Sequence, residues 1–111
     1  MEYSAEIYKI GGPEVIQIVK NDLKKPIGNE VLIRHKAIGV NYIDIYYRSG
    51  MYPLASLPGK LGHEASGVVE EIGENVTLFK VGDRVAYVTA SPGSYSTSRI
   101  VSENEIIKIP K

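Results

Sequence analysis

The sequence predicts a mainly β protein, a barrel or sandwich of short strands with one short helix, in a single domain that spans residues 1–111. Short β-branched and apolar runs recur at regular spacing along the chain, separated by turns that contain glycine and proline. One segment, residues 41–50, breaks this pattern with helical start and stop signals. A length of 111 residues allows one core domain and is too short for two.

The amino-terminal segment is expected to form a β-hairpin. Residues 2–10 mix tyrosine, isoleucine and charged residues in rough alternation, and they end at Gly11-Gly12-Pro13, a combination typical of a turn. The apolar, β-branched run 15–20 is the expected returning strand. The polar segment 21–29, which contains a proline and a glycine, is expected to be a loop.

Residues 30–40 show the clearest strand pattern, with a period of two. Arg34 and Lys36 are expected on one face. The apolar residues expected on the opposite face are Val31, Ile33 and Ala37. His35 falls on this apolar face, and we interpret it as a half-buried histidine that is hydrogen-bonded to a neighbouring strand.

Residues 41–50 are expected to form a short helix. Asn41 is a favourable residue at a helix start, Asp44 lies in the first turn, and Gly50 can adopt the left-handed conformation that ends a helix. The segment 51–61 contains two prolines and is expected to be a loop.

The second half of the chain is organised around the glycine-rich stretch 57–88. Its glycines, flanked by β-branched runs, predict a backbone that turns sharply or approaches another segment closely. His63 and Glu64 lie at the start of the first strand in this stretch. The expected strands are residues 65–72, 83–88, 95–101 (an edge strand) and 105–109.

The charge balance and composition disfavour several classes of protein. Basic and acidic residues are equal in number, 13 of each, and neither half of the chain is strongly basic, so nucleic acid is not an expected partner. The sequence has no cysteine, which removes disulfides and thiolate chemistry. It has no apolar run long enough for a bilayer and no recognisable secretion signal, so a cytoplasmic protein without a membrane partner is expected.

Common catalytic motifs are missing from the sequence. The two histidines, without any thiol, do not form a zinc-binding pattern. There is no G-x-S-x-G element, which disfavours a hydrolase of that type. There is also no G-x-G-x-x-G fingerprint and no Walker loop, so the common devices for holding a diphosphate are absent from the sequence.

A group of tyrosines within residues 42–52 is the strongest candidate for a binding site. Its members are Tyr42, Tyr46, Tyr47 and Tyr52, and they are accompanied by Asn41, Asp44 and Arg48. Two interpretations are open. The rings either fill the core where the helix meets the sheet, or they line a cleft around a flat aromatic ligand.

Several motifs, in the right order, resemble the zinc-independent NADPH:quinone oxidoreductases, the zeta-crystallin group of the medium-chain dehydrogenase/reductase superfamily. GHEASGVVEEIGENV fits the superfamily pattern G-H-E-x-x-G-x5-G-x-x-V. The segments that resemble the quinone oxidoreductase branch are GGPEV, KAIGVNYIDIYYRSGMYP, GDRVAYV and GSYSTSRIV. Together they cover essentially the whole chain.

This resemblance implies a GroES-like domain, a partly open β-barrel of short strands with one or two short helices. In the family a Rossmann domain with the dinucleotide fingerprint follows, and we expect that domain to be absent from this chain. The implied reaction transfers a hydride from NADPH to a quinone or a similar conjugated carbonyl. NADPH would be bound mainly by the missing domain, so the chain alone is expected to fold without turning over substrate.

The resemblance also implies the site residues. The matched positions that line the nicotinamide and substrate side of the family's cleft are Asn41, Asp44, Tyr46 and Tyr52, with Arg48 as a neighbour and His63 with Glu64 on the cleft floor. Tyr46, Tyr52 and Asn41 are the expected hydrogen-bond donors to the quinone oxygen. Zinc-dependent relatives carry a cysteine ligand where this chain has Asn41, so no zinc is expected.

Two other interpretations are a non-catalytic binding or assembly module with the same barrel, and a truncated gene remnant. Members of the family are usually homodimers. The surface that a truncated chain would expose is expected to self-associate.

Overall fold

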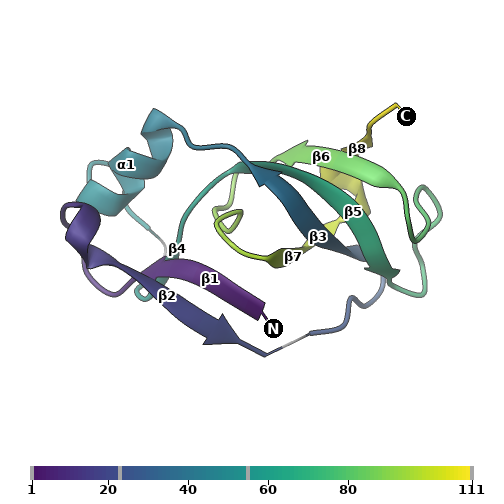
Figure 1. The fold of residues 1–111 in the computed structure, drawn as a ribbon, viewed down its shortest axis with the longest axis horizontal. Coiled ribbons are helices and arrows are strands. Elements are labelled where there is room, and N and C mark those ends of the chain that lie inside the picture. The colour runs from purple at the N-terminus through teal and green to yellow at the C-terminus, as the bar shows by residue number, and fades with distance from the viewer. Residues whose placement is uncertain (1, 23, 55, 111) are drawn as a thin grey trace.

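The computed structural model describes residues 2–22, 24–54 and 56–110, which form two antiparallel sheets, one α-helix and two 3-10 helices (Figure 1). One sheet has the strand order β2-β1-β4, and the other has the order β7-β3-β5-β6-β8. The strands are β1 (Glu2–Ile7), β2 (Ile16–Asn21), β3 (Glu30–Ile38), β4 (Gly59–Lys60), β5 (Glu64–Ile72), β6 (Arg84–Val88), β7 (Ser98–Ser102) and β8 (Ile106–Lys108). The helices are α1 (Tyr42–Ser49), η1 (Pro13–Val15) and η2 (Glu103–Glu105).

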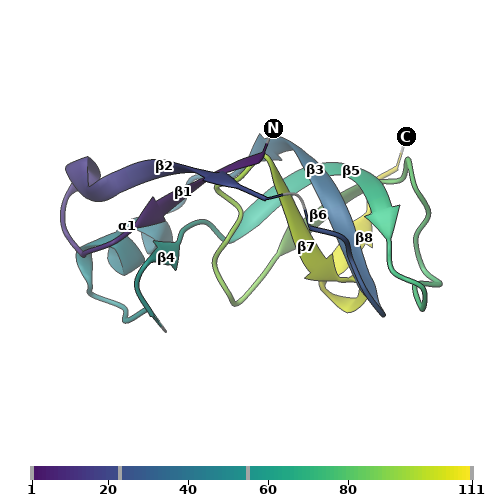
Figure 2. The same cartoon turned by 90° about the horizontal axis from the view of Figure 1, so that it is seen from below.

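This architecture confirms the predicted mainly β fold. The expected hairpin pairs β1 with β2 from Glu2↔Asn21 to Ile7↔Ile16. The two sheets are connected by an isolated bridge between Ser4 and Ser96. They do not close into one continuous sheet in the described part of the chain, as expected for a partly open barrel. Figures 1 and 2 show α1 beside the turn end of the β1–β2 hairpin, at the opposite end of the molecule from β8.

The prediction that residues 51–61 form only a loop is wrong at its end. Gly59 and Lys60 form β4, which pairs with the end of β1 through Glu6↔Lys60 and Ile7↔Gly59. Two residues are too few to show a sequence period, so only the pairing with β1 makes this segment a strand. The expected strands 2–10 and 95–101 are also shorter in the structure, because β1 ends at Ile7 and β7 begins at Ser98.

The larger core lies on one face of the five-stranded sheet. Its buried residues are Val31, Ile33, Ala65, Val69, Val85, Tyr87, Val101 and Ile106. The alternation expected for β3 holds only in part, because Leu32 is buried as well and Ala37 is exposed. The pairing of β3 with β5 shifts register between Leu32 and Ile33 and again between His35 and Ala37. Such irregularities change which side chains face the core.

His35 is half-buried and hydrogen-bonded, as interpreted from the sequence, but its partners do not lie in a strand next to β3, since Ser96 precedes β7 and Tyr87 lies in β6. The ring is half-buried, its Nδ1 lies 2.8 Å from the Ser96 carbonyl oxygen, and its Nε2 lies 2.7 Å from the Tyr87 hydroxyl. Because a carbonyl can only accept, Nδ1 donates to Ser96 and Nε2 accepts from Tyr87. Burial lowers the pKa of His35 and so favours this neutral form.

A second, smaller core supports α1. Its buried residues are Ile7, Val15 and Leu61, and the partly buried side chains packed against them are Ile16, Tyr47, Leu54 and Tyr95. These residues come from β1, η1, β2 and α1, from the connection between α1 and β4, and from the segments before β5 and β7. The small core therefore attaches the helix to the three-stranded sheet.

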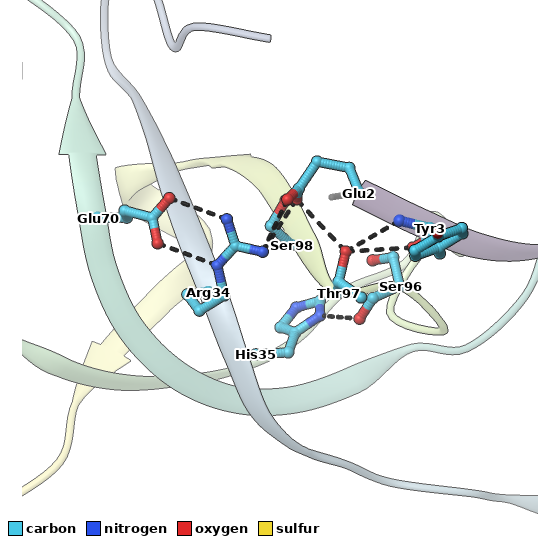
Figure 3. A network of polar contacts seen from close by, with 8 residues as sticks. All are labelled: Glu2, Tyr3, Arg34, His35, Glu70, Ser96, Thr97 and Ser98. Carbon is cyan, nitrogen blue, oxygen red and sulfur yellow. Dashed lines mark hydrogen bonds and ion pairs between the residues drawn. The ribbon is translucent and has the colours of Figure 1, made fainter. Parts of the chain in front are cut away.

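Arg34 on β3 binds two carboxylates, Glu2 of β1 in the other sheet and Glu70 of the neighbouring strand β5, so its contact with Glu2 connects the two sheets (Figure 3). Its Nη1 donates to both Glu2 oxygens, at 2.8 and 3.1 Å, while Nε and Nη2 donate to Glu70 at 2.9 and 3.0 Å. The Ser98 hydroxyl also donates to Glu2. Burial works to raise the pKa of Glu2, but the hydrogen bonds from Ser98 and Arg34 outweigh it and lower the value. The bond from Arg34 likewise lowers the pKa of Glu70.

These lowered pKa values predict that the fold loses stability in acid. Groups with lowered folded-state pKa values stabilise the fold above the ordinary carboxyl value of 4.5 and lose this contribution as the pH falls below it. Arg34→Gln is expected to lower the free energy of unfolding at pH 7 by about 1–3 kcal/mol, and to make stability less dependent on pH between 5 and 3. Urea unfolding at several pH values measures both effects.

Arg84→Gln is the matched control for this experiment. Arg84 is an exposed arginine on β6 whose guanidinium, among the described residues, contacts only the Pro110 carbonyl oxygen, through Nη1 at 3.4 Å. This variant removes the same charge without removing a carboxylate partner, so its pH dependence is expected to match that of the unaltered chain. An equal acid sensitivity in the Arg34→Gln and Arg84→Gln variants would contradict the assignment.

Candidate functional site

The candidate site is built around α1, whose ends match the sequence prediction. Asn41 has extended backbone angles, and its backbone N–H donates to Asp44 Oδ2 at 3.0 Å. The Asp44 N–H donates to the Asn41 carbonyl oxygen at 3.1 Å. At the other end Gly50 adopts a left-handed conformation with φ of 90°, and its N–H donates to the Tyr47 carbonyl oxygen. A residue with a side chain is strained in that conformation, so the glycine ends the helix.

Four aromatic rings form a contiguous cluster beside α1. The ring centroids of Tyr46 and Tyr52 lie 5.4 Å apart and those of Tyr47 and Tyr52 lie 5.8 Å apart, both in edge-to-face geometry. The Tyr47 ring lies 5.1 Å from the His63 ring. These spacings are favourable for aromatic pairs. The fold thus brings Tyr46, Tyr52 and His63 together, and Tyr47 connects them.

The two interpretations of the tyrosines apply to different residues. Tyr47 packs against the smaller core. Tyr42 is 78% exposed and Tyr52 is 44% exposed. In the described part of the chain, neither the Tyr46 nor the Tyr52 hydroxyl has a hydrogen-bond partner. Tyr47 is therefore a core residue, while Tyr46 and Tyr52 keep free hydroxyl groups.

His63 is buried and is oriented by a backbone carbonyl. Its Nδ1 lies 2.8 Å from the Thr89 carbonyl oxygen, so in the neutral ring Nδ1 carries the proton. Its Nε2 is buried without a hydrogen-bond partner in the described part of the chain. This nitrogen can accept one hydrogen bond.

Asp44 and Arg48 make contacts within the domain. Asp44 is 4% exposed, and its Oδ2 also accepts a hydrogen bond from the Tyr95 hydroxyl at 2.6 Å. Arg48 Nε donates to the Gly11 carbonyl oxygen at 3.2 Å, and the Gly11 N–H donates to the Arg48 carbonyl oxygen at 2.9 Å. Asp44 thus links the first turn of α1 to Tyr95, whereas Arg48 attaches the last turn of α1 to the β1–η1 connection.

Two pockets of the described structure lie away from the predicted site residues. One, of about 560 Å³, is lined by residues of the β2–β3 connection and of β7, and another, of about 410 Å³, is lined mainly by apolar residues of β1, β2 and the end of β3. None of the six predicted site residues lines either pocket. Asn41 and Tyr52 are exposed, whereas Asp44 and His63 are buried, so the predicted site residues extend from the surface into the interior.

Residues that sequence reasoning missed contribute to the same region. Tyr95 holds Asp44, Thr89 orients His63, and Ser94 is fully buried with an unpartnered hydroxyl. Tyr95 belongs to the GSYSTSRIV segment, which was interpreted as an edge strand and as a family motif but not as part of the site. Its aromatic ring in an otherwise small and polar segment is the available sequence signal.

The described residues offer neither a metal-binding cluster nor a membrane-spanning helix. They contain no cluster of three or more histidine, cysteine, aspartate or glutamate side chains arranged to hold a metal ion. Over the same residues, no helix combines the length and the apolar character needed to cross a bilayer.

Comparisons with known proteins agree with this geometry. Residues 28–111 match the family model described as "Alcohol dehydrogenase GroES-like domain". A quinone oxidoreductase of Pseudomonas aeruginosa is 48% identical over 100 residues, which cover 90% of this chain and 31% of that protein. The chain thus spans about a third of the length of such curated relatives.

Solved structures show the same likeness. The quinone oxidoreductase of Pseudomonas syringae pv. Tomato superposes with a TM-score of 0.94 at 46% identity, over 100% of this chain and 34% of that one. The Escherichia coli quinone oxidoreductase, complexed with NADPH, superposes with a TM-score of 0.94 at 42% identity, over 97% of this chain and 33% of that one. The resemblance to quinone oxidoreductases is confirmed, and the chain belongs to the alcohol dehydrogenase GroES-like domain family.

Proposed function

We propose that this chain forms the nicotinamide- and quinone-facing side of an NADPH-dependent quinone oxidoreductase. The observation that carries the proposal is the cluster of Tyr46, Tyr52 and His63 at α1, the helix that begins after Asn41, in a fold that superposes closely on the NADPH-complexed E. coli relative. In this proposal a second, dinucleotide-binding domain supplies most of the contacts to NADPH. Homodimer formation belongs to the same proposal, and exposed apolar side chains such as Val40 support self-association.

The chemistry requires orientation and hydrogen-bond donors. Hydride transfer needs the nicotinamide carbon held close to the acceptor, and orientation of this kind can supply about 7–11 kcal/mol. Negative charge then arrives on a quinone oxygen and is stabilised by donors placed beside it. The free hydroxyls of Tyr46 and Tyr52, with the side-chain amide of the exposed Asn41, are the proposed catalytic donors.

The remaining predicted residues have supporting roles in this proposal. His63 Nε2 can accept a hydrogen bond from the cofactor side of the site. Next to the Nε that binds Gly11, Arg48 retains two guanidinium nitrogens without a hydrogen-bond partner in the described part of the chain. Asp44 orients Asn41 by accepting a hydrogen bond from its backbone N–H. The proposed donors are an amide and phenols, which do not form the usual zinc site of thiolates and imidazoles, so the proposed transfer is zinc-independent.

Binding to the 111-residue chain tests this proposal. We expect duroquinone to shift the NMR resonances of Tyr46, Tyr52 and Asn41. Tyr52→Phe is expected to weaken this binding about 2–10-fold, the effect of losing one hydrogen bond. Tyr42→Phe is the matched control, because Tyr42 is 78% exposed on the same helix.

Turnover gives an independent readout. The chain incubated with NADPH and 1,4-benzoquinone is expected to show no NADPH oxidation above a protein-free sample, since it forms only one side of the proposed site. Steady oxidation would contradict that expectation. Absence of any shift near Tyr46 with duroquinone at millimolar concentration would contradict the substrate assignment and favour a non-catalytic binding module.

A further inference from the structure

Tyr95 contacts several parts of the molecule that carry the candidate site. Its N–H donates to the Leu61 carbonyl oxygen at 3.0 Å, and its carbonyl oxygen accepts from the Ala5 N–H at 2.8 Å. Its hydroxyl donates to Asp44 Oδ2 at 2.6 Å. Tyr95 thus connects β1, the segment before His63 and the first turn of α1.

The Tyr95 ring packs against the backbone of Gly62, where there is no room for a side chain. A Cβ atom at Gly62 would lie 2.5 and 2.9 Å from two carbons of this ring, and Gly62 has a φ of +91°, which disfavours a side chain for a second reason. Without a side chain at residue 62, the ring packs directly against the backbone next to His63. This packing fixes the direction in which the hydroxyl points.

The Tyr95 hydroxyl donates to the Asp44 carboxylate, the same group that accepts from the Asn41 N–H at the start of α1. Asp44 Oδ2 is shared by the Tyr95 O–H and the Asn41 N–H, and Asp44 Oδ1 is buried without a partner. Burial and the Asp44 hydrogen bond raise the pKa of Tyr95, so its hydroxyl stays a donor at neutral pH. Asp44 is 4% exposed, so its carboxylate has little access to water. If the Tyr95 hydroxyl is removed, this buried carboxylate keeps only the hydrogen bond from the Asn41 N–H, which is unfavourable for a buried charged group.

We propose that Tyr95 is a positioning residue for the candidate site: its hydroxyl holds Asp44, and Asp44 in turn holds Asn41 and the first turn of α1 in the orientation that presents Asn41 and Tyr46. The role in quinone binding rests on the proposed function. The positioning of Asn41 is a property of this chain and can be measured without any ligand.

Tyr95→Phe tests the proposal, because it removes the hydroxyl and keeps the ring that packs on Gly62. We expect amide hydrogen exchange at residues 41–44 to become at least 10-fold faster, while exchange in β3 and β5 changes little. The side-chain carboxyl ¹³C resonance of Asp44 is expected to shift. Tyr8→Phe is the matched control, because Tyr8 is a half-exposed tyrosine outside the site, and it is expected to change neither readout.

Asp44→Ala provides a second variant, in case Tyr95→Phe folds poorly. It removes the acceptor and is expected to reproduce the faster exchange at Asn41. Because both groups act through one hydrogen bond, the combined variant is expected to exchange no faster than Asp44→Ala alone. Additive effects, or a uniform change of exchange across all strands, would overturn the positioning role.

Duroquinone titration separates this inference from the proposed function. If duroquinone binds the unaltered chain, Tyr95→Phe is expected to weaken that binding about 3–10-fold. Unchanged affinity in this variant would overturn the positioning of the site. If duroquinone fails to bind the unaltered chain, the proposed function fails, and the local exchange result still decides whether Tyr95 positions Asn41.

Discussion

Gly67→Ala is expected to destabilise the chain by about 3 kcal/mol or more, at the upper end of the range for overpacked sites. A Cβ atom at residue 67 would lie 2.2 Å from the carbonyl oxygen of Arg34 and 2.9 Å from its carbonyl carbon. These are backbone atoms of the neighbouring strand β3, and they cannot rotate away as the end of a side chain can. Gly67 pairs with His35 next to a register shift, so relief of the clash requires separation of β3 and β5 in the sheet that carries the larger core.

Urea unfolding of the Gly67→Ala variant measures this loss, and Gly28→Ala is its matched control. Gly28 has a φ of +60°, but a Cβ atom there would meet nothing within 4 Å. The control therefore carries only the backbone strain of a left-handed residue, about 1–2 kcal/mol. A Gly67→Ala variant no less stable than Gly28→Ala would show that β3 can move aside at little cost.

Leu61→Ala is expected to cost about 2–5 kcal/mol, the range for truncating a buried leucine. Leu61 is 1% exposed, and with Ile7 and Val15 it forms the smaller core against which Tyr47 and Tyr95 pack. A core with so few buried members has little capacity to refill a cavity. We therefore expect α1 and its rings to loosen before the five-stranded sheet unfolds.

Amide hydrogen exchange in the Leu61→Ala variant distinguishes local from global loss. Exchange in α1 is expected to accelerate far more than exchange in β3, β5 and β6. Leu78→Ala is the control, because Leu78 is 59% exposed and its truncation is expected to change stability by less than about 0.5 kcal/mol. Equal acceleration in α1 and β5 would mean that the two cores unfold as one unit.

Local signals allowed prediction of the elements from the sequence. Asn41, Asp44 and Gly50 have intrinsic preferences for the start and the end of a helix, and the structure places α1 between them. The β-branched runs likewise predicted most of the strands. The expected close approach in the glycine-rich stretch is confirmed at Gly67, whose Cβ position lies against the backbone of β3. β4 was missed because its two residues become a strand only through β1.

The candidate site was predicted less completely, because its arrangement depends on contacts between distant segments. The tyrosines could be named as a group, but the sequence could not show that Tyr47 packs on the smaller core while the Tyr46 and Tyr52 hydroxyls stay free. The Tyr95–Asp44 hydrogen bond joins residues 51 positions apart. A pattern of neighbouring residues in the sequence cannot predict a contact between positions so far apart.

By itself, the sequence determined the mainly β class, the position of the helix and the family resemblance, because each depends on residue preferences or motifs within a few neighbouring positions. The tertiary structure alone decided that Arg34 joins the two sheets through Glu2, and that Tyr95 supports the start of α1. Such contacts form only when packing has brought remote backbone segments within hydrogen-bond distance. A polar group that is buried there loses its hydrogen bonds to water, so it must form hydrogen bonds with other groups of the protein.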